Sequence, residues 1–564
     1  MYSSSNKIIY VFTICYFTIA SLFLLFSFPF EDALILFRYS SNFASSNIIS
    51  FNINGLPTEG ATDFLWMIVI GGLAKIRVDP AISALILNSI GFYLILHILF
   101  NKIVRKQSYL FYLLISIIFI NIGPIIASSI GGFSILAFFS IGLMMYVSAY
   151  EKKLLHWTIF SICFCLLRPE GVIFFIPTFF IILLNLKKNE IQRLLLSSLV
   201  IILSGLLYFI FRYFYFGEFL PLPLMVKKIG GELSFTRFIT TFLQVTNTFV
   251  ISMLIVIFIY LIKNYKKINE VNKNEFIIFA IITFFTFIYL FSVSTTYQSQ
   301  NIFFRYFAHF NFILFIMCVY ALDKISINKK TLLICFVILG FGSLTQSNFL
   351  LRITNIEKYV ISHPTYKIVN QFNENNFAKH PLVSVGYSLK KSKEDLSIML
   401  TEAGAIPYIS EKKIIDMAGL NFPKYAKQPV SCKDFTIYKP DLIEFDIGLI
   451  EAFNVNELIE NSLYPNCGVI KKDKLMMNKN FLDTSILKYH NEYNENQIDK
   501  HKNATVIVAA ENATACLLDN KRYNMVFLNK KSDQIYLFSS ESNIADYLLA
   551  SCSFESHGYI LDMF

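Results

Sequence analysis

Long apolar runs, separated by short basic segments, dominate the first 350 residues of the chain. Most runs are about 20 residues long, the length that an α-helix needs to cross the hydrocarbon core of a bilayer. We count about 11 such runs, and each predicts a membrane-spanning helix. They cover residues 8–28, 81–100, 109–125, 131–149, 154–167, 171–186, 192–214, 240–262, 275–294, 304–322 and 331–349. The pattern therefore predicts a polytopic α-helical membrane protein.

The pattern changes after residue 349. Residues 350–564 have ordinary polarity, and apolar and polar positions alternate over 505–509, 524–528 and 534–538. Such alternation predicts β-strands, and helices are expected between them. A segment of roughly 200 residues is long enough for one or two α/β or α+β domains. We therefore expect a transmembrane domain over 1–349 and a soluble domain over 350–564.

The positions of the basic residues predict the orientation of the chain, because Lys and Arg between spans resist export from the cytoplasm. The clusters are Lys102/Arg105/Lys106, Lys152/Lys153, Lys187/Lys188/Arg193, Lys263/Lys266/Lys267/Lys273 and Lys324/Lys329/Lys330. Placing them all inside gives a cytoplasmic N-terminus and, with an odd number of spans, an extracytoplasmic C-terminal domain. Residues 29–80 then form the first outer loop. Its apolar piece, 64–76, is too short to span and predicts an interfacial or re-entrant helix.

The composition supports the membrane assignment. Of the 564 residues, 55% are hydrophobic and 16% are charged, and the mean hydropathy is +0.54. Soluble domains average about 25% charged residues, so a soluble enzyme, a disordered chain and a nucleic-acid-binding protein are excluded. Four of the nine cysteines lie after residue 349, namely Cys432, Cys467, Cys516 and Cys552. They form two disulfides in one of three pairings or stay as thiols, and the sequence does not choose.

Two adjacent carboxylates, Glu31 and Asp32, directly follow the first apolar run. Charge beside hydrocarbon is costly and is usually retained for function. Such a pair serves to deprotonate a hydroxyl, to hold a divalent cation, or only to end a helix in solvent. Arg38 follows within about two helical turns, where it would orient a carboxylate or meet a phosphate. Trp66, in the same loop, is either a membrane-interface anchor or a platform for a sugar ring.

The first outer loop as a whole resembles that of the GT-C membrane glycosyltransferases, which use polyprenyl-phosphate-linked sugars. The nearest branch is related to terminal β-arabinofuranosyltransferases, and its loop reads approximately D-D-A-[FY]-I-x-x-R-Y-x-x-N, then V-E-G-x-T-x-x-L-W. Glu31 replaces the first acid of this pattern, which favours Asp32 as the base. The positions that fit are Asp32, Ala33, Arg38, Tyr39, Asn42, Glu59, Gly60, Thr62, Leu65 and Trp66.

Later fragments resemble the same branch in the same order. Leu167–Gly171 is similar to L-x-R-P-E-G, although Pro169 could equally mark a helix break with a local ion pair. The segment from Arg212 to Lys227 partly resembles R-x-x-Y-F-G-x-x-L-P-N-x-x-Y-A-K, and Arg305-Tyr306 resembles R-Y. In the soluble domain, two segments resemble E-x-G-x-I-P-Y and D-x-x-G-L-N; these are Glu402–Tyr408 and Asp416–Asn421.

One departure concerns an acid of the family. The family often has S-G-[ML]-E before its fourth span, where this chain reads Ser129-Ile130-Gly131-Gly132. If that Glu has a task, another residue must perform it here. Basic residues on the outer side also oppose the orientation signal, so an anion such as a lipid phosphate is expected to compensate them.

The resemblance implies a GT-C-like enzyme, an inverting glycosyltransferase of the bacterial plasma membrane. It would transfer arabinofuranose, or another pentose or hexose, from a polyprenyl-phosphate donor to an envelope glycan or lipopolysaccharide. Asp32 and Glu31 would be catalytic, and the same two residues would hold a divalent cation if one is used; no other cofactor is implied. The implied phosphate-binding residues are Arg38, Arg168, Arg212, Lys227 and Arg305. The implied substrate-binding residues are Tyr39, Asn42, Glu59, Trp66 and Glu170.

Two other classes stay open at this point. A transporter or flippase of lipid-linked glycans would need ionisable residues at mid-span depth. A noncatalytic membrane protein would only present its soluble domain to a partner. The notable charges instead gather at one predicted surface, which favours the transferase.

Overall fold

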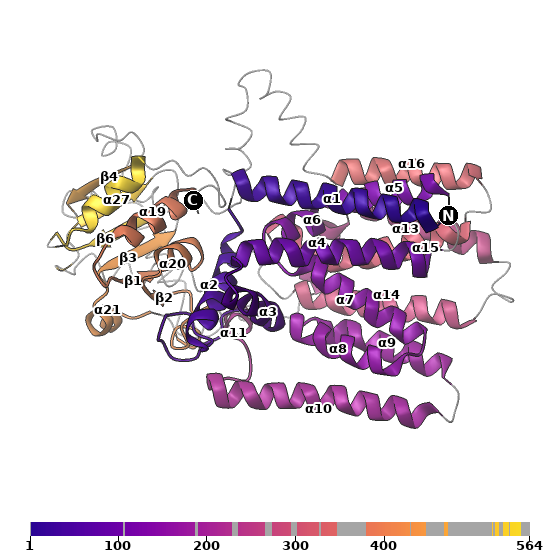
Figure 1. The fold of residues 1–564 in the computed structure, drawn as a ribbon, viewed down its shortest axis with the longest axis horizontal. Helices are drawn as coiled ribbons and strands as arrows, with labels where there is room; N and C mark the ends of the chain where they lie inside the picture. Colours follow the sequence, from indigo (N-terminus) through magenta and orange to yellow (C-terminus); the bar gives the residue numbers. More distant parts are fainter. Residues whose placement is uncertain are drawn as a thin grey trace, which may run out of the picture.

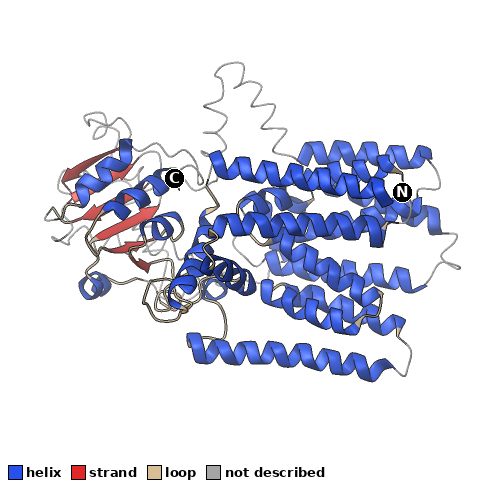
Figure 2. Cartoon of the chain, in the orientation of Figure 1, coloured by secondary structure: helices blue, strands red, loops and turns tan. Residues whose placement is uncertain are grey.

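Parallel helices form a bundle from the apolar part of the chain, and a smaller domain that carries all the described strands lies at one end of it (Figures 1 and 2). The structure is a computed structural model. It describes residues 2–26, 28–104, 108–186, 190–227, 235–246, 248–265, 273–294, 302–325, 329–346, 380–428, 430–446, 467–471, 522, 525–529, 534–540 and 542–553. The start of the chain lies at the end of the bundle away from the smaller domain (Figure 1).

A helix occupies each apolar run that the sequence singles out. The helices are α1 (Tyr2–Phe26), α4 (Pro80–Ile98), α5 (Tyr109–Ile120), α7 (Ile135–Tyr150), α8 (Leu154–Leu167), α9 (Gly171–Asn185), α10 (Ile191–Phe216), α13 (Thr248–Tyr265), α14 (Lys273–Ser294), α15 (Ala308–Ile325) and α16 (Lys329–Gln346). Local chemistry sets several ends. Asp79 accepts hydrogen bonds from the amides of Ala81 and Ile82 and so caps α4. Gly217, at φ +75°, ends α10 in the left-handed conformation that glycine adopts without strain.

Five helices in the described part of the chain are long and apolar enough to cross a membrane. They cover Ser5–Leu25, Pro80–Ile103, Ile191–Phe216, Ile277–Ser294 and Arg305–Lys324. A sixth is added if α5 and α6 (Gly123–Ile130), which meet at 64°, form one broken span. Other apolar helices, among them α7, α8 and α9, have 10–17 residues. The mostly helical fold is compatible with a membrane protein, and the crossing by all 11 runs stays a prediction.

Short helices connect the bundle to the smaller domain. The expected outer loop folds as α2 (Glu31–Ser46) and α3 (Phe64–Lys75), so the apolar piece at 64–76 is helical. These two helices and α11 (Leu222–Lys227) lie between the bundle and the strands (Figure 1). A methyl group on Gly71 would lie 2.8 Å from the ring of Phe43, so the missing side chain lets α3 pack closely on α2. Three further short elements are η1 (Leu99–Ile103), α12 (Phe235–Val245) and η4 (Ile302–Phe307).

The smaller domain, called the tail below, is built on a mixed sheet with the strand order β2-β1-β3-β6-β5-β4. Its strands are β1 (Ser397–Leu400), β2 (Lys413–Asp416), β3 (Leu442–Asp446), β4 (Cys467–Lys471), β5 (Met525–Asn529) and β6 (Gln534–Phe538). β1 pairs in parallel with β2 and β3, whereas β6 pairs antiparallel with β3 and β5, and β5 with β4. The helices are α19 (His380–Lys391), α20 (Ala405–Ser410), α21 (Cys432–Tyr438) and α27 (Ile544–Ser553).

The predicted strands at 524–528 and 534–538 are confirmed as β5 and β6, and residues 505–509 lie outside the described residues. The choice between disulfides and thiols also stays open. The structure does not describe the side chains of the four cysteines concerned, Cys432, Cys467, Cys516 and Cys552.

Candidate active site

A cavity of about 390 Å³ lies where the bundle, the short outer helices and the tail meet. Its wall is assembled from α2, α3, the connection between α8 and α9, α14 and η4, and Leu420 of the tail closes one side. Its lining includes five charged side chains and one tryptophan: Asp32, Asp63, Arg168, Glu170, Arg305 and Trp66. Five of these six belong to the set predicted from the sequence.

Asp32 and Arg305 both line the cavity and form an ion pair in its wall, although 273 residues separate them in the chain. Asp32 lies in the first turn of α2, where the exposed backbone amides favour a carboxylate. The guanidinium of Arg305 comes from η4 and lies 4.6 Å from the ring centroid of Phe133. The side chain of Asp32 is 30% exposed and that of Arg305 is 8% exposed, so Asp32 is the more accessible member of the pair.

A second ionic cluster surrounds Arg168, at the break between α8 and α9. Arg168 Nη1 lies 3.0 Å from Asp63 Oδ2, and Arg168 Nε lies 2.7 Å from Glu170 Oε1. Ser134 Oγ donates a hydrogen bond of 2.5 Å to the same oxygen of Asp63. Arg168 is therefore fixed in place by two carboxylates. Sequence reasoning did not single out Asp63; its position directly after the matched Thr62 and before α3 was the available signal.

Trp66 belongs to the wall of the cavity. Its side chain is buried, and Nε1 donates a hydrogen bond of 3.3 Å to the carbonyl oxygen of Gly132. Gly132 belongs to the segment that departs from the family pattern. Among the described lining residues, three carboxylates face two guanidinium groups. Arg168 and Arg305 are thus each paired with a carboxylate, and a lipid phosphate that compensates them stays a prediction.

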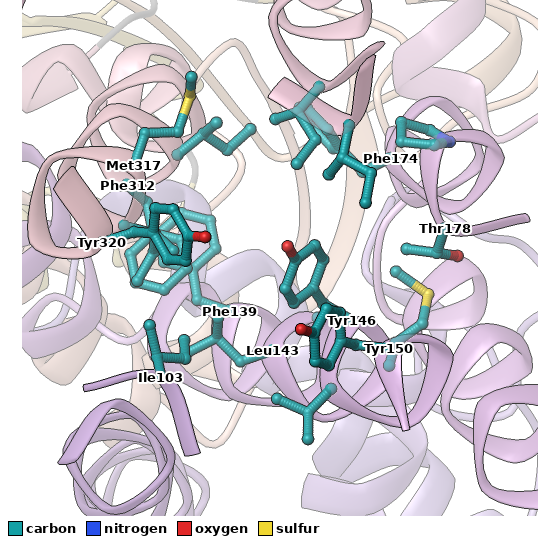
Figure 3. A pocket seen from close by; sticks show the side chains of 18 of the residues that line it. Ile103, Phe139, Leu143, Tyr146, Tyr150, Phe174, Thr178, Phe312, Met317 and Tyr320 are labelled. Carbon is teal, nitrogen blue, oxygen red and sulfur yellow. The ribbon is translucent and has the colours of Figure 1, made fainter. Parts of the chain in front are cut away.

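A second, apolar cavity of about 290 Å³ lies deeper in the bundle, between α7, α9, α14 and α15. Figure 3 shows the side chains that enclose it, including those of Phe139, Leu143, Phe312 and Met317. His309 lines this cavity, and its Nε2 lies 3.5 Å from Oε1 of Glu170 in the first one. The other lining charges are Lys102, Glu151, Asp323 and Lys324. No sequence motif pointed to this cavity or to His309.

Two predicted residues, Arg212 and Glu59, are placed elsewhere. They form an ion pair in which both side chains are 1% exposed, and neither lines the first cavity. Arg212 also donates to the carbonyl oxygen of Phe219 at 2.8 Å and to the hydroxyl of Tyr208 at 3.2 Å. The pair ties the outer loop to the end of α10, and a role of either residue at a phosphate or substrate stays a prediction.

Arg38 likewise points away from the cavity. Its guanidinium donates to the carbonyl oxygens of Phe51 at 2.6 Å, Lys412 at 2.8 Å and Pro407, and to the side chain of Asn52 at 3.3 Å. These contacts join the outer loop to the tail. The expected encounter of Arg38 with a phosphate therefore has no support in its surroundings.

Tyr39 and Asn42 hold the outer loop rather than line the cavity. The hydroxyl of Tyr39 accepts a hydrogen bond of 2.8 Å from the amide of Gly60. Asn42 Nδ2 donates to the carbonyl oxygens of Ser50 and Phe51 at 3.0 and 2.9 Å. The side chain of Lys227, the remaining predicted phosphate ligand, lies outside the described residues.

The two adjacent acids separate. Asp32 lines the cavity, whereas Glu31 Oε1 accepts hydrogen bonds from the backbone amides of Gly404 and Ala405 in the tail, at 2.7 and 2.8 Å. A cation site shared by both carboxylates is therefore not assembled. Within the described ranges, no group of three or more His, Cys, Asp or Glu side chains is arranged to hold a metal ion.

Asp416 organises the turn that presents Leu420 to the cavity. Its carboxylate accepts hydrogen bonds from the amide of Ala418 at 2.9 Å and from the amide and side chain of Asn421, both at 2.8 Å. The side chain is buried, and the loss of solvation outweighs these hydrogen bonds and raises the pKa of Asp416 to about 6.

This raised pKa predicts a pH dependence of tail stability. The folded tail binds the proton of Asp416 more tightly than the unfolded chain does, so its contribution is complete below about pH 4 and is lost as the pH rises through about 6. We expect the thermal unfolding midpoint of the wild type to fall between about pH 5 and pH 7. Asp416→Asn should lack this component. The measurement is the thermal unfolding midpoint of both proteins as a function of pH. An equal fall of the midpoint in the wild type and in Asp416→Asn would contradict the prediction.

Comparison with known proteins adds one match. Residues 370–524 match a family model described as a domain of unknown function, DUF8728. The match lies within the tail, includes the segment 404–421 that touches α2 and the cavity, and leaves the bundle uncovered. No curated protein matches the chain.

Proposed function

We propose that the protein is an inverting GT-C-type glycosyltransferase, which transfers a sugar from a polyprenyl-phosphate donor to a hydroxyl group of an envelope glycan or glycolipid. The observation that carries the proposal is the pairing of Asp32 with Arg305 in a cavity that also contains Arg168. The apolar helices suit a multi-pass protein of the plasma membrane. The proposed orientation has 11 crossings, a cytoplasmic N-terminus and an extracytoplasmic cavity and tail.

The proposed reaction is a single displacement. Asp32 takes the proton of the acceptor hydroxyl while the hydroxyl oxygen attacks the anomeric carbon of the donor sugar. The bond from that carbon to the phosphate oxygen breaks, and the phosphate leaves with the electron pair. Because attack and departure occur on opposite faces, the anomeric configuration inverts. Arg305 and Arg168 would stabilise the charge that grows on the leaving phosphate oxygens.

The ion pairs at the cavity support this chemistry. A guanidinium has five N–H donors and can therefore contact a carboxylate and a phosphate at the same time. The ion pairs described above involve Nη2 of Arg305 and Nε and Nη1 of Arg168. Asp63 and Glu170 would act as positioning residues that fix Arg168. A phosphate that shares Arg305 would draw it from Asp32, so donor binding would prepare Asp32 to accept the hydroxyl proton.

The apolar cavity suits the lipid part of such a donor. It has His309 and Phe174 in its lining. Aromatic and aliphatic side chains make up most of the rest (Figure 3). An isoprenoid chain would gain affinity there by burial of apolar surface, without a specific polar contact. Trp66, in the wall of the first cavity, would lie beside the sugar.

A donor panel tests the proposal. The full-length protein, purified in detergent or nanodiscs, is incubated with polyprenyl-phosphate pentoses and hexoses and with glycan or lipopolysaccharide acceptors, with and without a chelator. Mass spectrometry should detect an acceptor that is heavier by one sugar residue, and Asp32→Asn serves as the blank. Absence of product from every donor would contradict the transferase. Movement of a lipid-linked glycan across liposomes without transfer would instead favour a flippase.

A further inference from the structure

The two neighbouring acids of α2 face different partners, and this places the tail in direct contact with the helix that carries Asp32. Glu31 Oε1 holds the amides of Gly404 and Ala405, as described above. A methyl group on Gly404 would collide with the carbonyl oxygen of Glu31. The tail therefore approaches α2 so closely at this point that no side chain fits at residue 404.

Two further contacts hold the same face of the tail. Asn52 pairs with Ile414 of β2 through two hydrogen bonds of 2.8 Å, in which Asn52 Nδ2 donates to the carbonyl oxygen and Oδ1 accepts from the amide. Arg38 holds the carbonyl oxygens of Pro407 and Lys412. All three anchors come from residues 31–52, and all fall on residues 404–414 of the tail.

The turn that follows these anchors reaches the cavity. Leu420 lines it, and a methyl group on Gly60 would collide with Asn421 Oδ1 and press against the carbonyl oxygen of Leu420 at 2.5 Å. Residues Gly60, Ala61 and Thr62 line the cavity beside this contact. The tail thus contributes Leu420 to the lining of the cavity, through a turn that Asp416 holds in shape.

We propose that residues 404–421, docked on α2 and reaching the cavity through Leu420, form its acceptor-side wall, and that Glu31 is the positioning residue that fixes this wall beside Asp32. The inference rests on the proposed transfer reaction and adds to it where the acceptor lies. In the proposed function the lipid-linked donor enters from the bundle, so the side of the cavity at Leu420 is the one that would meet a hydroxyl-rich glycan from the aqueous side.

The length of the Glu side chain supports this role. Glu31 reaches two amides of another domain with one oxygen, and an Asp at this position would be shorter by one methylene group. The acid that differs from the family pattern is therefore the one that contacts the tail, and the acid that matches the pattern lines the cavity.

Hydrogen exchange and kinetics on the full-length protein test the proposal together. In Glu31→Ala, the amides of the peptide that contains Gly404 and Ala405 should exchange about tenfold faster than in the wild type. The KM for the acceptor should rise about tenfold, with the KM for the donor unchanged. Glu31→Gln keeps an acceptor oxygen and should recover most of both properties. Glu394→Ala removes an exposed carboxylate of the tail and is the matched control.

Gly60→Ala gives a second variant, which displaces the wall without touching Glu31. It should raise the KM for the acceptor in the same way. Unchanged exchange in Glu31→Ala, or a rise in the donor KM instead of the acceptor KM, would overturn the proposal. If the wild type transfers no sugar, the proposed function and the acceptor role both fail, whereas the exchange rates still decide whether Glu31 fixes the wall.

Discussion

Asp32→Asn is expected to lower the rate of sugar transfer at saturating donor by about 10²–10⁴-fold, the usual contribution of a general base. Asn has nearly the same shape as Asp and can still accept a hydrogen bond from Arg305. It cannot take up the proton of the attacking hydroxyl. The side chain is 30% exposed, so the substitution should leave the fold intact.

The measurement is single-turnover transfer with each purified variant, alongside its thermal unfolding midpoint. Asp395→Asn makes the same chemical change at an exposed position of the tail that lines neither cavity, and it is the control. A rate within about threefold of the wild type would remove Asp32 from the role of base. If Asp32→Asn loses the fold together with the transfer rate, Asp32→Glu replaces it as the test. Asp32→Glu keeps the carboxylate and should retain measurable transfer.

Glu59→Gln is expected to destabilise the protein by about 3–5 kcal/mol, the cost of leaving one member of a buried ion pair without its partner. Both side chains of the Glu59–Arg212 pair are 1% exposed. The neutral amide would face a buried guanidinium that has lost its counter-charge. Since the pair ties the outer loop to α10, we expect the loop that carries Asp63 and Trp66 to loosen first.

The double substitution of Glu59 by Leu and Arg212 by Met separates the charge from the packing. Apolar residues of similar volume remove both charges, and such replacements are often neutral or stabilising. The unfolding midpoint of the double variant should therefore exceed that of Glu59→Gln. The exposed pair Lys390–Glu411, at 50% and 57% exposure, is the control, and its loss should cost at most about 1 kcal/mol. Equal costs for the buried and exposed pairs would contradict the prediction.

Local pattern was sufficient to predict the helices and part of the tail. Each apolar run forms a helix because its side chains favour burial in protein or lipid over water, whatever the rest of the chain does. Alternation likewise located β5 and β6. The order of the motifs and their predicted place on the outer side of the membrane also selected five residues that the structure brings to one cavity. These are Asp32, Trp66, Arg168, Glu170 and Arg305.

Pattern could not assign partners to charged side chains. Arg38 and Arg212 have the same residue type as Arg168 and Arg305, and all four were expected at a phosphate. Partners of charged side chains come from segments up to 374 residues away. Arg38 donates to the carbonyl oxygen of Lys412, and Glu31 accepts from the amide of Ala405. A burial-driven helix is determined by its own residues, whereas the task of a buried charge is determined by the group that offsets its desolvation, and only the packed structure selects that group.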